Sequence, residues 1–253
     1  MTTHLLSDTA ILTGRSLRHI LRSPDTIITT ALMPIAFMLL FVYVLGGAIN
    51  SGSDSYVAYL LPGILVITVA SGISYTAYRL FMDLKGGIVA RFQSMPIARS
   101  SVLWAHVLTS LVANLVAAVV VVLVALAMGF RTGASVLAWL GVAGIVGLFT
   151  LALTWVAVIP GLTAKTVDGA GAFSYPLILL PFISSAFVPT ATMPGPVRWF
   201  AENQPVTSIV DAIRDLFTGQ PVGSALWVAL GWCLVILAVA YAVAMRVYRS
   251  RVS

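Results

Sequence analysis

The sequence predicts an all-α integral membrane protein with six transmembrane helices. Two observations carry this prediction: 60% of the 253 residues are hydrophobic while 9% are charged, and the mean hydropathy is +1.03. A soluble domain has about 25% charged residues, because charged side chains cover the surface that meets water. With so few charges this chain cannot cover such a surface, so we expect one membrane domain over residues 1–253.

Six apolar runs are long enough to cross a bilayer, which takes about 20 residues of α-helix. They are 27–49, 57–78, 102–129, 136–159, 172–188 and 222–245, and none of them contains Asp, Glu, Lys or Arg. The fifth run is the shortest and contains Pro176 and Pro181. Because proline removes a backbone donor and kinks a helix, we expect this span to be bent.

The distribution of basic residues predicts the orientation. Six crossings place the N-terminus, the second and fourth connections and the C-terminus on one side, which then holds eleven of the 14 Lys and Arg residues. Segments rich in Lys and Arg stay in the cytoplasm. We therefore expect a multi-pass protein of the cell membrane with both termini cytoplasmic. This topology also accounts for the formal charge of +6, so nucleic acid is not an expected partner.

An amphipathic helix is expected over residues 4–23, before the first span. Arg15, Arg18 and Arg22 recur at helical spacing among apolar residues, and Ser23-Pro24 ends the helix. Such a helix lies on the inner leaflet with its arginines at the lipid phosphates, which makes membrane lipid an expected partner. The alternative is a frayed basic tail.

The cytoplasmic connection 79–101 carries more apolar side chains than a linker needs. Phe92, Met95 and Ile97 are among them, and they favour contact with a partner surface. Gly86-Gly87 and Pro96 are expected to divide the connection into short helical pieces. The alternative is an amphipathic loop that rests on the bilayer.

The external segment 189–219 is expected to form a structured cap or a re-entrant hairpin. Four prolines divide it, and Trp199 and Phe200 suit the membrane interface. Apolar residues repeat at helical spacing in its second half, opposite Asp211, Arg214 and Asp215. The apolar residues are Ile209, Val210, Ile213, Leu216 and Phe217.

The chain lacks the motifs of an enzyme. The string from Gly161 to Thr166 contains Lys165 but not the glycine pattern of a phosphate loop, so any ATP must be bound by another chain. No paired carboxylates or Ser/His or metal cluster stand at one level, so neither a catalytic site nor a metal or cofactor is expected. Charged groups at bilayer depth, which ion-coupled transporters use, are absent from the six spans.

The polar residues within the spans are uncharged, and some of them are candidates for a substrate path. We assign Ser71, Ser74, Asn114 and Thr154 to that path. For Asn114 the alternative is a hydrogen bond between helices, and His106, near the cytoplasmic end of the third span, is interpreted as a packed or interfacial residue.

Two strings resemble type-2 ATP-binding-cassette export permeases. Asp83, Gly86-Gly87, Arg91 and the string from Met95 to Arg99 resemble the pattern between the second and third spans of that family. The string 182–219 resembles the daunorubicin-resistance branch of the family. The family pattern has leucine where this chain has Met95, a mild apolar exchange. The order and spacing of the resemblance extend over essentially the whole chain.

The resemblance implies an exporter with two permeases and two copies of an ATPase subunit, which holds ATP and Mg²⁺. It implies that residues 4–23 form an elbow helix and that the loop after the second span is the coupling helix that docks on the ATPase. The residues carried over to this coupling element are Asp83, Gly86, Gly87, Arg91, Phe92, Met95, Pro96, Ile97 and Arg99.

We therefore expect a permease, most simply a homodimer, that exports a drug, antibiotic or lipid from the cytoplasm. The alternative is a passive channel or a transporter that does not use ATP. A channel needs a filter of backbone carbonyls or charged rings at depth, and the sequence contains neither pattern.

Overall fold

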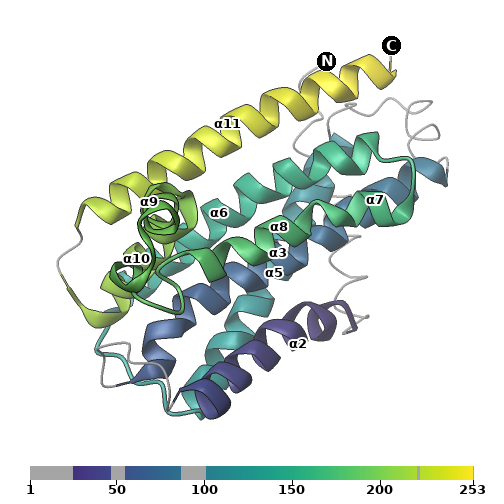
Figure 1. The fold of residues 1–253 in the computed structure, drawn as a ribbon. Coiled ribbons are helices and arrows are strands. Elements are labelled where there is room, and N and C mark those ends of the chain that lie inside the picture. Colours follow the sequence, from purple (N-terminus) through teal and green to yellow (C-terminus); the bar gives the residue numbers. More distant parts are fainter. Residues whose placement is uncertain (1–24, 47–54, 87–100, 221–222, 253) are drawn as a thin grey trace.

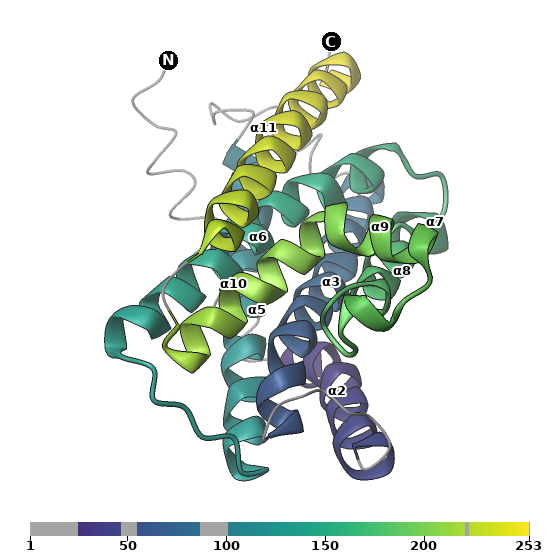
Figure 2. The ribbon, with the colours of Figure 1, turned by 60° about the vertical axis from the view of Figure 1, so that its left-hand side comes forward.

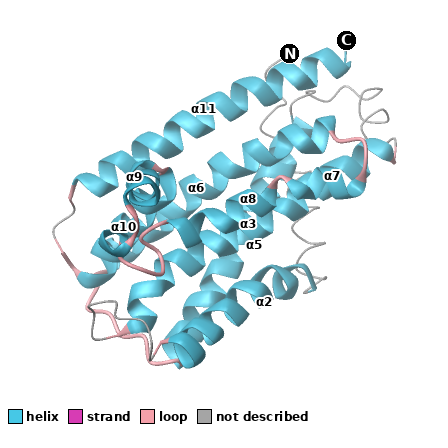
Figure 3. Cartoon of the chain, viewed as in Figure 1, coloured by secondary structure: helices cyan, strands magenta, loops and turns pink. Residues whose placement is uncertain are grey.

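The computed structural model describes residues 25–46, 55–86, 101–220 and 223–252. The regular elements of this part of the chain are all helices (Figure 3). The prediction of an all-α protein is therefore confirmed. The predicted elbow helix at residues 4–23 and the connection from Gly87 to Ser100 lie outside the described residues.

Four helices of the described chain are long and apolar enough to cross a membrane. They correspond to the second, third, fourth and sixth predicted spans. Their bounds are α3 Tyr56–Lys85, α5 Ser101–Ala127, α6 Val136–Thr163 and α11 Ser224–Val252.

Helices α3, α6 and α11 continue past the C-terminal ends of their predicted spans, whereas α5 ends two residues before its predicted end. Helix α3 continues past Tyr78 to Lys85, so the first part of the predicted connection 79–101 is helical. Hydropathy marks only the segment suited to hydrocarbon, whereas a helix continues through polar sequence until its geometry is interrupted. For α3 this happens at Gly86, whose N–H donates to the Met82 carbonyl over 2.8 Å.

The first and fifth predicted spans correspond to shorter apolar helices. Helix α2, Asp25–Leu39, contains Pro34 and continues as the π-helix η1, Leu40–Leu45. The fifth span is bent, as its prolines predict, but it begins earlier than predicted. It consists of α7 Val167–Ala172, α8 Ser174–Leu179 and the 3-10 turn η2 Leu180–Ile183.

Helix α3 forms the centre of the bundle. It packs against α2, α5, α6, α7, α8 and α10 (Figures 1 and 2). In its most apolar stretch of 18 residues, 83% is buried. Helix α11 lies on the outside and packs on α6 and α10. In its most apolar stretch of 18 residues, only 22% is buried. Because the free side of α11 is apolar, it is suited to face lipid.

Two short helices lie at the end of the bundle opposite the chain's C-terminus (Figure 1). They are α9, Gly195–Asn203, and α10, Pro205–Thr218, and the turn η3, Thr190–Thr192, precedes them. The five apolar residues that predict the buried face of α10 are all buried. The helix ends at Gly219, whose φ of 69° is a conformation that glycine adopts without strain.

Candidate functional site

A cleft of about 650 Å³ opens between α2, α3, α7 and α8. Helix α3 contributes Ser71, Ser74, Tyr75 and Tyr78, whose spacing places them on one face of the helix. Pockets for drug-sized molecules occupy about 300–1,000 Å³ and combine apolar walls with a few polar groups. The cleft has the size and the mixed lining of such a site.

The break in the fifth span brings α7 close to α3. Thr166 caps α7, since its hydroxyl accepts a hydrogen bond from the Gly169 N–H over 3.1 Å, and this orients the first turn. A Cβ atom added to Gly171 would stand 3.2 Å from the Ser74 hydroxyl oxygen. The small residue at position 171 therefore permits the close approach that forms one wall of the cleft.

The structure separates the four candidate path residues into two groups. Ser71 and Ser74 line the cleft, and the Ser71 hydroxyl has no hydrogen-bond partner among the described residues. Thr154 is buried within α6 and donates to the Thr150 carbonyl over 2.6 Å. Thr154 is thus satisfied within its own helix and is not a lining residue of the cleft.

Asn114 is a residue of α5 that faces α3, beside a small cavity of about 20 Å³. Its amide donates to the Ser110 carbonyl over 2.9 Å, while its carbonyl oxygen has no partner among the described residues. A Cβ atom at Gly72 would come within 2.0 Å of that oxygen. Asn114 therefore packs against the bare backbone of Gly72, and its exposure to substrate stays a prediction.

Asp83 lies in the last turn of α3, where it meets α5. Its Oδ2 atom stands 3.1 Å from Nε2 of His106, which has 14% of its side chain exposed. Asp83 and His106 therefore join the two helices that enter and leave the predicted coupling connection. Within that connection the structure describes only Asp83 and Gly86 of the residues assigned to coupling.

The other assigned residues lie outside the described part of the chain. They are Gly87, Arg91, Phe92, Met95, Pro96, Ile97 and Arg99 in the connection, and Arg15, Arg18 and Arg22 in the elbow. Among the described residues there is no group of three or more His, Cys, Asp or Glu side chains that could hold a metal ion.

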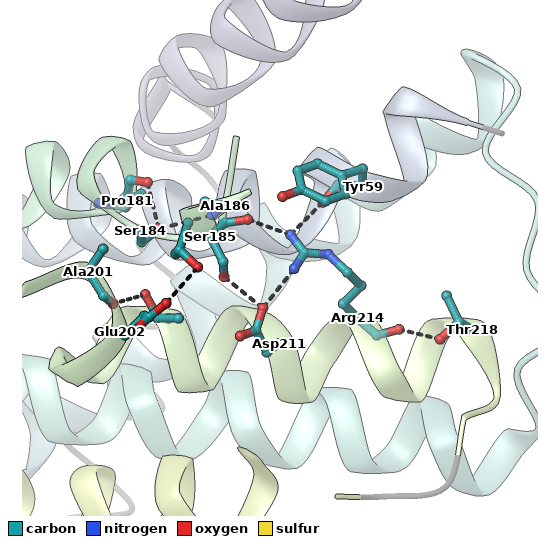
Figure 4. A network of polar contacts seen from close by, with 12 residues as sticks. Tyr59, Pro181, Ser184, Ser185, Ala186, Ala201, Glu202, Asp211, Arg214 and Thr218 are labelled. Atoms are coloured by element: carbon teal, nitrogen blue, oxygen red, sulfur yellow. Dashed lines mark hydrogen bonds and ion pairs between the residues drawn. The ribbon is translucent and has the colours of Figure 1, made fainter. Parts of the chain in front are cut away.

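A polar network joins α10 to α3 and to the segment that follows the broken fifth span (Figure 4). Arg214 donates to Asp211 Oδ1 over 2.7 Å, to the Ser185 carbonyl over 2.8 Å and to the Tyr59 carbonyl over 3.1 Å. Its guanidinium also lies 4.1 Å from the centre of the Tyr59 ring. One side chain thus holds three segments together at this end of the bundle.

Neighbouring groups complete the network. The Ser185 hydroxyl donates to Asp211 Oδ1 over 2.6 Å, so this carboxylate oxygen accepts from two side chains. Burial raises the pKa of Asp215; the Asp211 carboxylate adds to the shift and Arg214 opposes it. Gln204 donates from its amide to the carbonyls of Ile183 and Leu180, over 2.8 and 3.3 Å, and so satisfies backbone groups at the end of η2.

The sequence did not predict the inward position of Arg214. Helical periodicity places it with Asp211 and Asp215 opposite the apolar face, yet 19% of its side chain is exposed. Periodicity describes a helix against a uniform core and cannot anticipate carbonyl groups on a neighbouring segment. The available signal was the Asp-x-x-Arg spacing, which allows a pair within one turn of a helix.

Residues 7–218 match the ABC-2 type transporter family. The chain is 29% identical over 236 residues to the daunorubicin resistance ABC transporter permease protein DrrB1 of Streptomyces coeruleorubidus, covering 90% of this chain and 81% of the relative. It is also 29% identical over 247 residues to the probable doxorubicin resistance ABC transporter permease protein DrrC of Mycobacterium tuberculosis, covering 93% and 88%.

The match extends over most of the chain, including the cleft, Asp83 and the Arg214 network. The ATPase of such a transporter is a separate subunit, which agrees with the absence of a phosphate loop from this sequence. The chain therefore belongs to the ABC-2 type transporter family, as a permease subunit that takes part in transport and is not itself catalytic.

Proposed function

We propose that this permease exports a hydrophobic or amphipathic molecule from the cytoplasm, driven by a separate ATPase subunit. The observation that carries the proposal is the cleft between α2, α3, α7 and α8, whose volume suits a drug or lipid headgroup. The relatives named for daunorubicin and doxorubicin resistance support export of an antibiotic or drug. The walls of the cleft are largely apolar, which suits a hydrophobic or amphipathic substrate.

The proposed path begins at Ser71 and Ser74. Both lie in the second half of α3, toward the end of the bundle where the C-terminus lies. In this proposal that end is cytoplasmic, so substrate enters from the cytoplasm or the inner leaflet. The Arg214 network lies toward the opposite end, where it would hold the exit closed until the ATPase drives the change of state.

Six membrane crossings give this orientation. Two shorter apolar segments supply the remaining crossings. Helix α2 with η1 precedes α3, and α7 with α8 and η2 lies between α6 and α11. Pro176 and Pro181 leave backbone groups that α3 and the cap helices help to cover. Arg246 and Arg249 at the end of α11 favour a cytoplasmic C-terminus in the cell membrane.

Cysteine labelling tests the orientation in intact cells. Because basic residues keep their connections inside, cysteines introduced at Ser53 and Thr192 are expected to react with an impermeant thiol reagent added outside. Cysteines at Ser94 and Thr166 are expected to react only after the cells are opened. The native Cys233 is buried, which keeps the background low. The reverse labelling pattern excludes the six-crossing topology.

The permease is proposed to act as a homodimer with two ATPase copies. Large apolar side chains on α2, η1 and α8 are exposed, among them Leu32, Tyr43, Tyr175 and Leu179. The broken fifth span also needs a neighbour on its lipid side. We expect native mass spectrometry of the complex to give two permeases and two ATPases. A mass with one permease per complex contradicts the homodimer.

The connection after α3 is the proposed coupling element. Phe92, Met95 and Ile97 would fill a groove on the ATPase, while Arg91 and Arg99 would fix the register at its rim. The contact of 3.1 Å between Asp83 and His106 supports this role, because it links α3 and α5, the two helices that flank the connection. A movement that the ATPase imposes on the connection would then be transmitted to α3 and α5 together.

A further inference from the structure

We propose that Asp168, together with the tyrosines around it, makes the cleft selective for amphipathic organic cations. The inference rests on the proposed export function and adds to it a substrate class and a residue that determines it. Three features support it: the charge in the lining, the arrangement of the aromatic rings, and the order of polar and apolar groups along the cleft.

Asp168 supplies the charge. It is the only charged residue among the described residues that line the cleft. The side chain is exposed and forms no ion pair within the described part of the chain. The first turn of α7 is already capped by Thr166, so capping does not require this carboxylate. In a cleft with largely apolar walls, a carboxylate that forms no ion pair with a described residue attracts a cation and disfavours an anion.

The tyrosines supply faces for a cation. Tyr75 and Tyr78 stack with their ring centres 6.0 Å apart and their planes at 29°. The Tyr75 ring already has a guanidinium near it, since Arg79 lies 5.7 Å from its centre. Tyr175 stands across the cleft with 68% of its surface exposed. Aromatic faces attract cations through their quadrupole and also bury apolar surface, so they suit an amphipathic cation.

The polar and apolar groups follow one another along the cleft. Asp168 lies at the start of α7, near the end of the bundle that holds the C-terminus. Ile178, in α8, lies further along the fifth span, and Met33 of α2 also lines the cleft. A bound amphiphile would place its charge at Asp168 and its apolar body between the rings and these two side chains. A neutral lipid would gain nothing from the carboxylate.

Two ions of nearly equal shape and opposite charge test the inference. Tetraphenylphosphonium and tetraphenylborate are bound to the full-length permease in phosphatidylcholine nanodiscs, and binding to empty discs is subtracted. We expect tetraphenylphosphonium to bind more tightly. Asp168→Asn is expected to weaken its binding roughly fivefold, as for one partly exposed ion pair, and to leave tetraphenylborate unweakened. Equal effects on the two ions overturn the charge selectivity.

Matched variants separate this inference from the function on which it rests. Glu202→Gln removes one carboxylate on α9, away from the cleft, and is expected to change neither affinity. Met33→Trp narrows the cleft at a half-exposed position and is expected to weaken both ions. If Met33→Trp weakens both ions but Asp168→Asn weakens neither, the cleft remains the binding site and only the charge selectivity is wrong. If Met33→Trp changes neither affinity, the cleft is not the site and both proposals about it fail.

Discussion

An Arg91→Glu, Phe92→Ala double variant is expected to insert into the membrane normally but to lose its ATPase partner. The loss is expected because the variant removes a ring that is proposed to fill the ATPase groove and reverses a charge that is proposed to lie at its rim. Burying a phenylalanine contributes about 1.5–3 kcal/mol, which corresponds to a roughly tenfold to hundredfold change in affinity. We expect capture of the ATPase by the tagged permease to fall by at least this factor, and substrate-stimulated ATP turnover to disappear.

The double variant distinguishes docking from lipid anchoring. If the connection only rested on anionic lipid, Arg91→Glu would alter its attachment to the membrane but not the capture of a soluble domain. Arg198→Glu with Phe200→Ala is a matched control, because it changes the same residue types on α9, at the other end of the bundle. The control is expected to capture the ATPase at the parent level. Normal capture and turnover by the Arg91, Phe92 variant would show that another segment couples the subunits.

Arg214→Met is expected to destabilise the permease by about 2–3 kcal/mol, the effect of removing one partner from a mostly buried charged network. Methionine keeps much of the apolar stem but removes the hydrogen bonds to Asp211, Ser185 and Tyr59. Asp211 then loses its counter-charge, and α10 loses the hydrogen bond from Arg214 to α3, although the two helices still pack on each other. Thermal unfolding in nanodiscs measures the change. Arg214→Lys is expected to recover part of it, since lysine keeps the charge but not the planar fork.

Arg198 provides the control for Arg214. It forms an ion pair with Glu202 over 2.7 Å, but 49% of its side chain is exposed and the pair lies within one helix. The hydrogen bond from Arg198 lowers the pKa of Glu202 without joining separate segments. Exposed pairs of this kind contribute little to stability because water screens them, so Arg198→Met is expected to have a much smaller effect. Equal losses from Arg198→Met and Arg214→Met would contradict the role assigned to the Arg214 network.

Much of the fold follows from hydropathy because lipid leaves few alternatives to a helix. The backbone groups of a membrane span must be satisfied internally, so the apolar runs that become α3, α5, α6 and α11 could be predicted from composition. Their ends could not, because a cap at Ser55 or a stop at Gly86 depends on local geometry. Pro176 and Pro181 predicted the bend in the fifth span but not its division into α7, α8 and η2.

The candidate site depended on contacts between distant segments. Ser71 and Ser74 could be proposed because they are polar within an apolar run, but Asp168 belongs to a connection that the sequence assigned no role. Only the packing of α7 on α3 brings Asp168 and Ser74 to one cleft. Arg214 was missed for a related reason: its partners include the backbone carbonyls of Tyr59 and Ser185, which carry no signal in a sequence.

ATP turnover by the complex retained on the tagged, full-length permease decides whether this chain works with a separate ATPase. We expect the permease to retain a separate ATPase and the complex to hydrolyse ATP in nanodiscs. This turnover should be lost when the phosphate-loop lysine of the partner is substituted, because the permease itself contains no phosphate loop. A permease that retains no ATPase and passes substrate across a membrane without ATP would contradict the assignment to an ATP-driven transporter.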